Sequence, residues 1–147
     1  MRKINCAALP IAARAVISKV MRTILLTAAG GALGASARHL LSRYALHTFG
    51  PGFPWGTLLA NAIGGLAMGF LAGWLAFGVD GGKHLRLFLG VGLLGGFTTF
   101  SSFSLEAAMM IQRKAWSTAA GYVSISLILA IGGLFIGLYT ARRLFVS

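Results

Sequence analysis

The residues best suited to ion chemistry lie together at 92–103, which read GLLGGFTTFSSF. The glycine pair at 95–96 weakens a helix, and the hydroxyls that follow can form local hydrogen bonds in place of helical ones. Phe100 and Phe103 are three positions apart and share one helix face. Carbonyls freed by a break here can coordinate a cation, and the two rings can line a pathway. The sequence offers no nucleophile–base pair, and we expect no enzyme.

The composition places the chain in a membrane. It has 147 residues, of which 57% are hydrophobic and only 10% are charged, and its mean hydropathy is +0.83. A soluble domain of this length cannot hide so much apolar surface. We therefore expect a multi-pass protein of the cell (inner or plasma) membrane, in contact with lipid. Its one cysteine, Cys6, excludes an internal disulfide, and its three histidines lack metal-ligand spacing.

Four apolar segments follow one another, at about 24–46, 56–77, 85–111 and 116–140. Each is near the ~20 residues that a helix needs to cross the hydrocarbon core. The predicted fold class is an all-α membrane protein with four transmembrane helices and short loops. The third helix contains residues 92–103, and we expect it to be broken in mid-membrane. Because unpaired backbone is not tolerated against lipid, such a break lines a cavity or binds something.

The first twenty residues stand apart from this pattern. They carry four basic residues around short apolar runs, interrupted by Pro10. They fit a basic amphipathic leader, a poor signal peptide or a mis-assigned start. We interpret 1–20 as a basic N-terminal extension, with Met21 as the expected start, and 21–147 as the four-helix domain.

The basic residues number 13 against two acids, for a net charge of +11. They are scattered at segment ends, so we expect contact with anionic headgroups and no nucleic-acid binding. With four crossings, nine lie on one side and four on the other; starting at Met21 the numbers are five and four. Orientation follows this bias, so the shorter chain is expected to insert both ways up. The first side holds Arg2, Lys3, Arg14, Lys19, Arg22, Lys83, Arg86, Arg142 and Arg143; the second holds Arg38, Arg43, Arg113 and Lys114.

Small residues recur at helix-packing spacing in all four segments, as with Gly65 and Gly69 in the second and Gly133 and Gly137 in the fourth. Such spacing lets helices approach closely in a bilayer, and ordinary packing accounts for most of these glycines. Four helices with so many close-approach faces are too small to enclose a pore alone. We therefore expect a homo-oligomer.

Polar side chains inside the segments are costly in lipid and are candidates for function. Asn61 can donate into a pathway or bond a neighbouring helix as structural glue. Tyr122 and Ser126 continue a hydroxyl track from Thr118 at i, i+4 spacing, and the track stops at Ala130.

Two charged residues complete the candidates. Arg38 is either an anchor that extends to the headgroups or an attractor for an anion in a vestibule. Glu106 follows the broken stretch, where an acid can carry a proton or face water at the helix end.

Four motifs occur in order: GGALGASAR at 30–38, GTLLANAIGG at 56–65, GGFTTFSSFSLE at 95–106 and AAGYVSIS at 119–126. Together with four helices joined by short loops, they resemble the small fluoride channels of the Fluc or CrcB type. The resemblance covers about 21–143, and its most specific part is the run from the glycine pair to Phe103.

This resemblance implies a fluoride-selective channel that exports fluoride passively and relieves fluoride toxicity. It implies a dual-topology homodimer of antiparallel subunits, with two pores along the interface. It also implies a structural sodium ion at the dimer centre, held by backbone carbonyls at Gly95 and Thr98. Arg38 and Glu106 match vestibule positions, and Ala130 stands where family members can continue the hydroxyl track. The positions implied for the fluoride pore are Asn61, Thr99, Phe100, Ser102, Phe103, Tyr122 and Ser126.

A small four-helix proton-coupled multidrug exporter is the main alternative, because such carriers also assemble as antiparallel dimers. A carrier of this kind needs a membrane-embedded carboxylate, conventionally in its first helix. Here the first helix has no acid, and Glu106 lies in the third. Flux that is coupled to protons and depends on Glu106 would distinguish the exporter from the channel.

Overall fold

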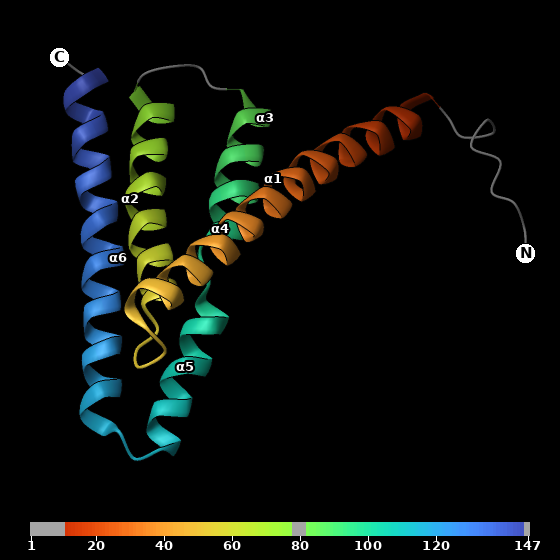
Figure 1. Cartoon of the computed structure of the whole chain (residues 1–147). Helices are drawn as coiled ribbons and strands as arrows, with labels where there is room; N and C mark the ends of the chain where they lie inside the picture. Colours follow the sequence, from red (N-terminus) through yellow and green to blue (C-terminus); the bar gives the residue numbers. More distant parts are fainter. Residues whose placement is uncertain (1–10, 78–81, 146–147) are drawn as a thin grey trace, which may run out of the picture.

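The computed structural model describes residues 11–77 and 82–145, and every regular element in them is helical (Figure 1). Four helices are long and apolar enough to cross a membrane: Ala13–Phe49, Trp55–Ala76, Lys83–Gln112 and Trp116–Phe145. The prediction of an all-α protein with four membrane-length helices is confirmed. The helical elements are α1 (Ile11–Phe49), α2 (Trp55–Phe77), α3 (Lys83–Leu85), η2 (Arg86–Leu94), α4 (Gly95–Phe97), α5 (Phe100–Gln112) and α6 (Trp116–Phe145).

The first helix is longer than the sequence indicated. We expected it to start near Ile24, whereas α1 already begins at Ile11 and runs unbroken through Met21. The sequence from Ile11 to Phe49 contains no proline that would end the helix. The glycines of this segment remain helical. At ~1.5 Å per residue, a helix of 39 residues is about twice as long as the hydrocarbon core is thick. Residues 1–10 of the predicted extension lie outside the described part of the chain.

The tightest packing is between α2 and α6, which lie side by side along their length (Figure 1). Glycines make this possible. A Cβ on Gly69 would collide with the carbonyl oxygen of Leu134, and one on Gly137 would collide with that of Leu66. The close-approach role predicted for these small residues is confirmed.

The slanted helix α1 crosses the third segment and packs on it through a second set of glycines (Figure 1). A Cβ on Gly34 would meet the backbone of Leu93 and Phe97, and one on Gly30 would meet the carbonyl oxygen of Phe88. The backbone of α1 therefore lies directly against the turns that lead to the 92–103 stretch.

The third segment changes its backbone conformation several times. It begins in α3, continues as the π-helix η2, in which Gly95 N–H bonds to the Gly90 carbonyl, and returns to α-helix in α4. Thr98 (φ −81°, ψ 154°) and Thr99 (φ −149°, ψ 118°) are both extended, and α5 begins at Phe100. The glycine pair, which we expected to weaken the helix, stays helical in α4, and the extended residues are the two threonines that follow it.

The beginning of α1, the end of α2, the beginning of α3 and the end of α6 lie at one end of the molecule (Figure 1). Two short connections close the other end. Gly50, with φ 78°, ends α1 and leads into the loop before Trp55, while Lys114, with φ 60°, lies in the turn between α5 and α6.

Candidate functional site

The extended residue Thr99 is held by a side chain from another helix. Asn61 of α2 donates from Nδ2 to the Thr99 carbonyl oxygen at 3.0 Å, and Thr99 N–H donates to Asn61 Oδ1 at 2.8 Å. The amide of Asn61 thus satisfies both peptide groups that an extended residue cannot bond within a helix. This pair of bonds fixes the point at which α4 gives way to α5.

Thr99 also caps the helix that follows it. Its Oγ1 accepts a hydrogen bond from Ser102 N–H at 3.2 Å and lies 3.2 Å from Ser102 Oγ. Capping by a threonine hydroxyl satisfies one of the first free N–H groups of a helix. It also removes Ser102 N–H from the carbonyl of Thr98, which it would bond in a continuous helix.

Two carbonyl groups consequently lose the donors that a continuous helix would give them. The partner expected for the Gly95 carbonyl is Thr99 N–H, which bonds to Asn61. The partner expected for the Thr98 carbonyl is Ser102 N–H, which bonds to Thr99. These are the two carbonyls that the family resemblance assigned to a cation.

Arg38 of α1 holds the other side of the interruption. Its Nε donates to the carbonyl oxygen of Gly96 at 3.3 Å. A cation near a helix C-terminus is favourable because the last carbonyls carry partial negative charge. The two sides of the interruption are therefore held by two different helices. Arg38 of α1 binds α4 on one side, and Asn61 of α2 binds Thr99 on the other.

A cavity of about 350 Å³ lies beside the interruption, between α2, α5 and α6. Phe100 and Phe103 form part of its wall, with ring centroids 5.7 Å apart. Ser126 lies on its α6 side, where its Oγ is buried and has no hydrogen-bond partner within 11–77 and 82–145. The other polar residues of the wall are Asn61, Thr98 and Thr99, and Ala130 lies on the α6 side.

One turn from Ser126 along α6, two hydroxyl groups donate hydrogen bonds to a carboxylate of α5. Glu106 Oε1 accepts from Thr57 Oγ1 at 2.8 Å, and Glu106 Oε2 accepts from the Tyr122 hydroxyl at 2.6 Å. Tyr122 is fully buried, and its ring packs against Phe103 and Phe53 at centroid distances of 5.3 Å and 5.5 Å. Three helices therefore meet at this carboxylate.

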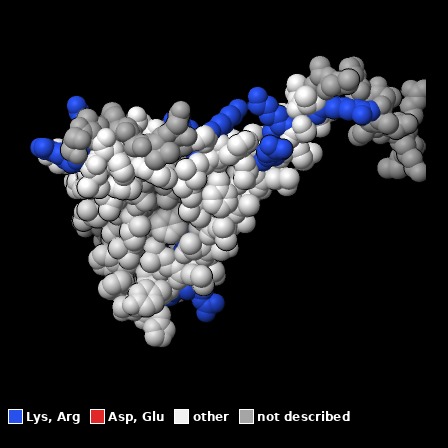
Figure 2. Space-filling model, turned by 90° about the horizontal axis from the view of Figure 1, so that it is seen from above, with Lys and Arg blue, Asp and Glu red and all other residues white. Residues whose placement is uncertain are grey.

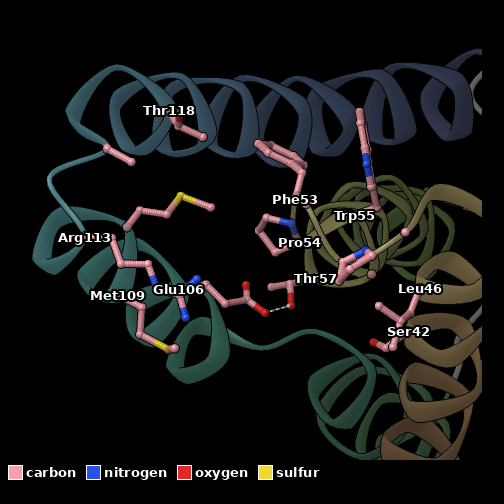
Figure 3. A pocket seen from close by; sticks show the side chains of 16 residues that line it. Ser42, Leu46, Phe53, Pro54, Trp55, Thr57, Glu106, Met109, Arg113 and Thr118 are labelled. Carbon is pink, nitrogen blue, oxygen red and sulfur yellow. Dashed lines mark hydrogen bonds between the residues drawn. The ribbon is translucent and has the colours of Figure 1, made fainter.

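Glu106 also lines a second cavity, of about 470 Å³, which the 50–54 loop borders as well (Figure 3). Arg113, in the turn after α5, lines the same cavity as Glu106 and Thr57 (Figure 3). The first cavity has an aromatic wall that also carries hydroxyls, and the second, which we call the mouth, is lined by the charged residues Glu106 and Arg113.

Comparison with known proteins decides the family. A family model described as "CrcB-like protein, Camphor Resistance (CrcB)" matches residues 25–138, most of the chain. The chain belongs to the CrcB family. It is 52% identical over 128 residues to the "Fluoride-specific ion channel FluC" of Caulobacter sp. (strain K31), covering 85% of this chain and 98% of that protein. A protein of the same name from Phenylobacterium zucineum (strain HLK1) is 55% identical over 126 residues, covering 85% and 99% of the two chains.

In this CrcB-family chain, most predicted pore positions are close together. Asn61, Thr99, Phe100, Phe103 and Ser126 line one cavity. Tyr122 connects to that wall through its packing on Phe103, and Ser102 connects through its bonds to Thr99.

The two predicted vestibule residues are separated. Glu106 lines the mouth cavity, whereas Arg38 lines neither that cavity nor the one at the interruption. The charged residues that share the mouth are instead Glu106 and Arg113.

Sequence reasoning missed three members of this site: Thr57, Phe53 and Arg113. A signal existed for Thr57, because it precedes Asn61 by four residues and so shares its helix face. Phe53 lies in a loop and Arg113 in a turn, so no periodicity indicated where either would lie.

Proposed function

We propose that this chain conducts fluoride passively across the membrane, as a fluoride-selective channel that relieves fluoride toxicity. Its relatives in the CrcB family carry the name of a fluoride-specific ion channel and match this chain along nearly their whole length. They are named as channels and not as enzymes or drug exporters. The observation in the structure that carries the proposal is the cavity lined by Phe100, Phe103, Asn61 and Ser126 beside the interruption.

This wall has the chemistry that a small anion needs. Fluoride loses hydration on entering a narrow pore, so donors must replace water; the Ser126 hydroxyl and the second N–H of Asn61 can do so. The edges of phenylalanine rings carry partial positive charge and give weak contacts to an anion. Conduction requires binding that is strong enough for entry and weak enough for release. Ring edges alternating with a few hydroxyls meet both conditions.

The mouth imposes a further condition on the anion. The Thr57 and Tyr122 hydroxyls both donate to Glu106. A fluoride ion that reaches this level competes with the carboxylate for the same two donors. Arg113 in the same cavity provides positive charge that offsets the repulsion between the anion and Glu106.

The functional unit in this proposal is a homodimer of antiparallel subunits with two pores. In a single chain, 76% of the Phe100 side chain is exposed although it lies beside the proposed pathway. A second copy placed against the interruption would cover this ring and complete the open side of the cavity. Association of two copies through this face is the arrangement that the family resemblance implies.

A structural sodium ion at the dimer centre fits the residues present. The carbonyls of Gly95 and Thr98 have lost their helical donors to Asn61 and Thr99. Backbone carbonyls freed in this way are typical sodium ligands in membrane helices. Within 11–77 and 82–145 no three His, Cys, Asp or Glu side chains gather around a metal site. We therefore assign the ion to these carbonyls, supplied by both subunits at an interruption in mid-membrane.

Fluoride efflux from liposomes containing the purified protein tests the channel. We expect fluoride to leave down its gradient without a proton gradient. Absence of flux from protein that is folded and dimeric would contradict the proposal. Flux that requires a proton gradient and is abolished in Glu106→Gln would favour the exporter instead.

The sodium assignment has its own test. Thermal unfolding of the dimer in sodium should occur at a higher temperature than in N-methylglucamine, because an ion that binds only the native state stabilises it. Equal stability in both solutions would remove sodium from the proposal and leave the fluoride assay unaffected. The same chain is expected in the inner membrane of the cell, where passive efflux lowers internal fluoride.

A further inference from the structure

The proposed channel function gives no role to the N-terminal part of α1. Residues 13–24, which we call the arm, are helical and extend beyond the packed body (Figure 1). Every side chain from Arg14 to Arg22 is exposed. Because α1 is slanted relative to α2 and α6, the arm leaves the body sideways, near the end where α6 finishes (Figure 1).

The arm has one apolar face. Successive helical residues are separated by about 100°, so positions i, i+1, i+4 and i+8 lie on one side. Val16, Ile17, Val20 and Ile24 follow this spacing, and their exposed fractions are 62%, 48%, 50% and 55%. This apolar stripe, exposed over about two and a half turns, has no partner among residues 11–77 and 82–145.

The opposite face of the arm is basic. Arg14, Lys19 and Arg22 share it with Ser18, and the arm contains no acid. Figure 2 shows Lys and Arg side chains along the projecting arm, with no acidic side chain visible in that view. An exposed apolar stripe opposite a cationic face is the pattern of a helix that lies in a membrane interface.

We propose that the arm is an in-plane anchor that docks on anionic lipid headgroups, with its apolar stripe inserted among the outer acyl carbons. Its location favours this occupant. Lys83 begins α3, and Arg142 and Arg143 lie in the last turn of α6, at the same end of the molecule as the arm (Figure 1), so the arm adds its cations to those already at this end. Anionic lipid neutralises these charges, whereas a second copy of the same arm would add more of them.

The size of the electrostatic contribution is measurable. Each cation close to an anionic surface favours the docked state about fivefold, so three together favour it roughly a hundredfold. This contribution decreases as salt shortens the screening length. Burial of the apolar stripe adds a part that salt does not remove.

The test uses two fluorescent probes on opposite faces of the arm. In the full chain with Cys6→Ser, a dye is attached at Val16→Cys on the apolar face or at Ser18→Cys on the basic face. The protein is reconstituted in phosphatidylcholine vesicles with or without phosphatidylglycerol, and a water-soluble quencher is added. We expect phosphatidylglycerol to protect the Val16 probe and leave the Ser18 probe accessible, with protection that weakens in high salt.

Charge variants make the test specific. Arg14→Gln, Lys19→Gln and Arg22→Gln together should expose the Val16 probe again, while Arg43→Gln with Lys114→Gln, at the other end of the molecule, should not. Equal quenching of both probes in all vesicles would overturn the proposal. Protection independent of lipid charge would also overturn it, as would protection that disappears when protein is diluted in the bilayer, since a second copy would then cover the stripe. None of these outcomes depends on fluoride conduction.

Discussion

Asn61 and Thr99 are joined by two hydrogen bonds, one from each residue, although 38 positions separate them in the chain. The side-chain amide acts on Thr99 as a neighbouring β-strand would, by accepting from its N–H and donating to its carbonyl. This relationship lets two extended residues exist in an otherwise helical segment without unsatisfied peptide groups. It gives Asn61 a structural role in addition to any contact with an ion.

Replacing Asn61 by aspartate tests this double role. The carboxylate keeps an acceptor for Thr99 N–H but places an oxygen against the Thr99 carbonyl, where a donor is needed. We expect fluoride flux to fall and the protein to lose about 1–3 kcal/mol of stability. Liposome efflux and thermal unfolding measure the two effects. Ser124→Ala, on an exposed face of α6, is the control, and equal behaviour of the two variants would remove Asn61 from both roles.

Phe100→Ile tests the aromatic wall of the cavity. Isoleucine keeps an apolar side chain beside the interruption but has no ring with a positive edge. We expect fluoride flux to fall about tenfold, the value of one weak aromatic contact, while the dimer remains assembled. Size-exclusion chromatography checks the assembly. Phe135, which is similarly exposed on α6, supplies the matched variant Phe135→Ile, and flux that is equal in both would contradict a pore role for Phe100.

Two glycines of α6 provide a matched test of the α2–α6 contact. A Cβ at Gly137 would collide with the backbone of Leu66 and Phe70, whereas a Cβ at Gly132 would meet nothing within 4 Å. Gly137→Ala should destabilise the protein by about 1–3 kcal/mol through overpacking. Gly132→Ala should be neutral or slightly stabilising, because alanine favours a helix. Thermal unfolding compares the two variants directly. Equal melting temperatures would show that α2 and α6 accept the added methyl group without loss of stability.

The orientation of the chain should depend on the residues before Met21. With four crossings, the full sequence is expected to place nine basic residues on one side and four on the other, and a chain that starts at Met21 five and four. C-terminal reporter fusions should therefore show both orientations for each chain, with a larger excess of one orientation for the full chain and near-equal amounts for the shorter one. Glutamine at Arg14 and Lys19 should shift the full chain toward near-equal amounts. A single orientation for every version would show that these charges do not set the topology.

The membrane class, the four helices and the composition of the site could all be predicted from the sequence. Hydrophobic run length is a local property, so each span could be located without knowing its neighbours. The residues around Thr99 were also identifiable, because a cluster of hydroxyls in an apolar segment is unusual whatever the tertiary structure. The N-terminal limit of α1 was predicted wrongly because hydropathy marks where a helix enters lipid and not where its backbone ends.

Which polar groups meet depends on how the helices pack, and this could not be predicted from the sequence. Asn61 reaches Thr99, Thr57 reaches Glu106 and Arg38 reaches Gly96 across separations of 38, 49 and 58 positions. Periodicity gives the face of a helix on which a residue lies, but not the helix that this face contacts. Glycine contacts between helix backbones fix those pairings, because they set which helices approach closely and at which level along their axes they touch. The same contacts decide that the extended residues are the threonines, whose peptide groups Asn61 can reach, and not the glycines that precede them.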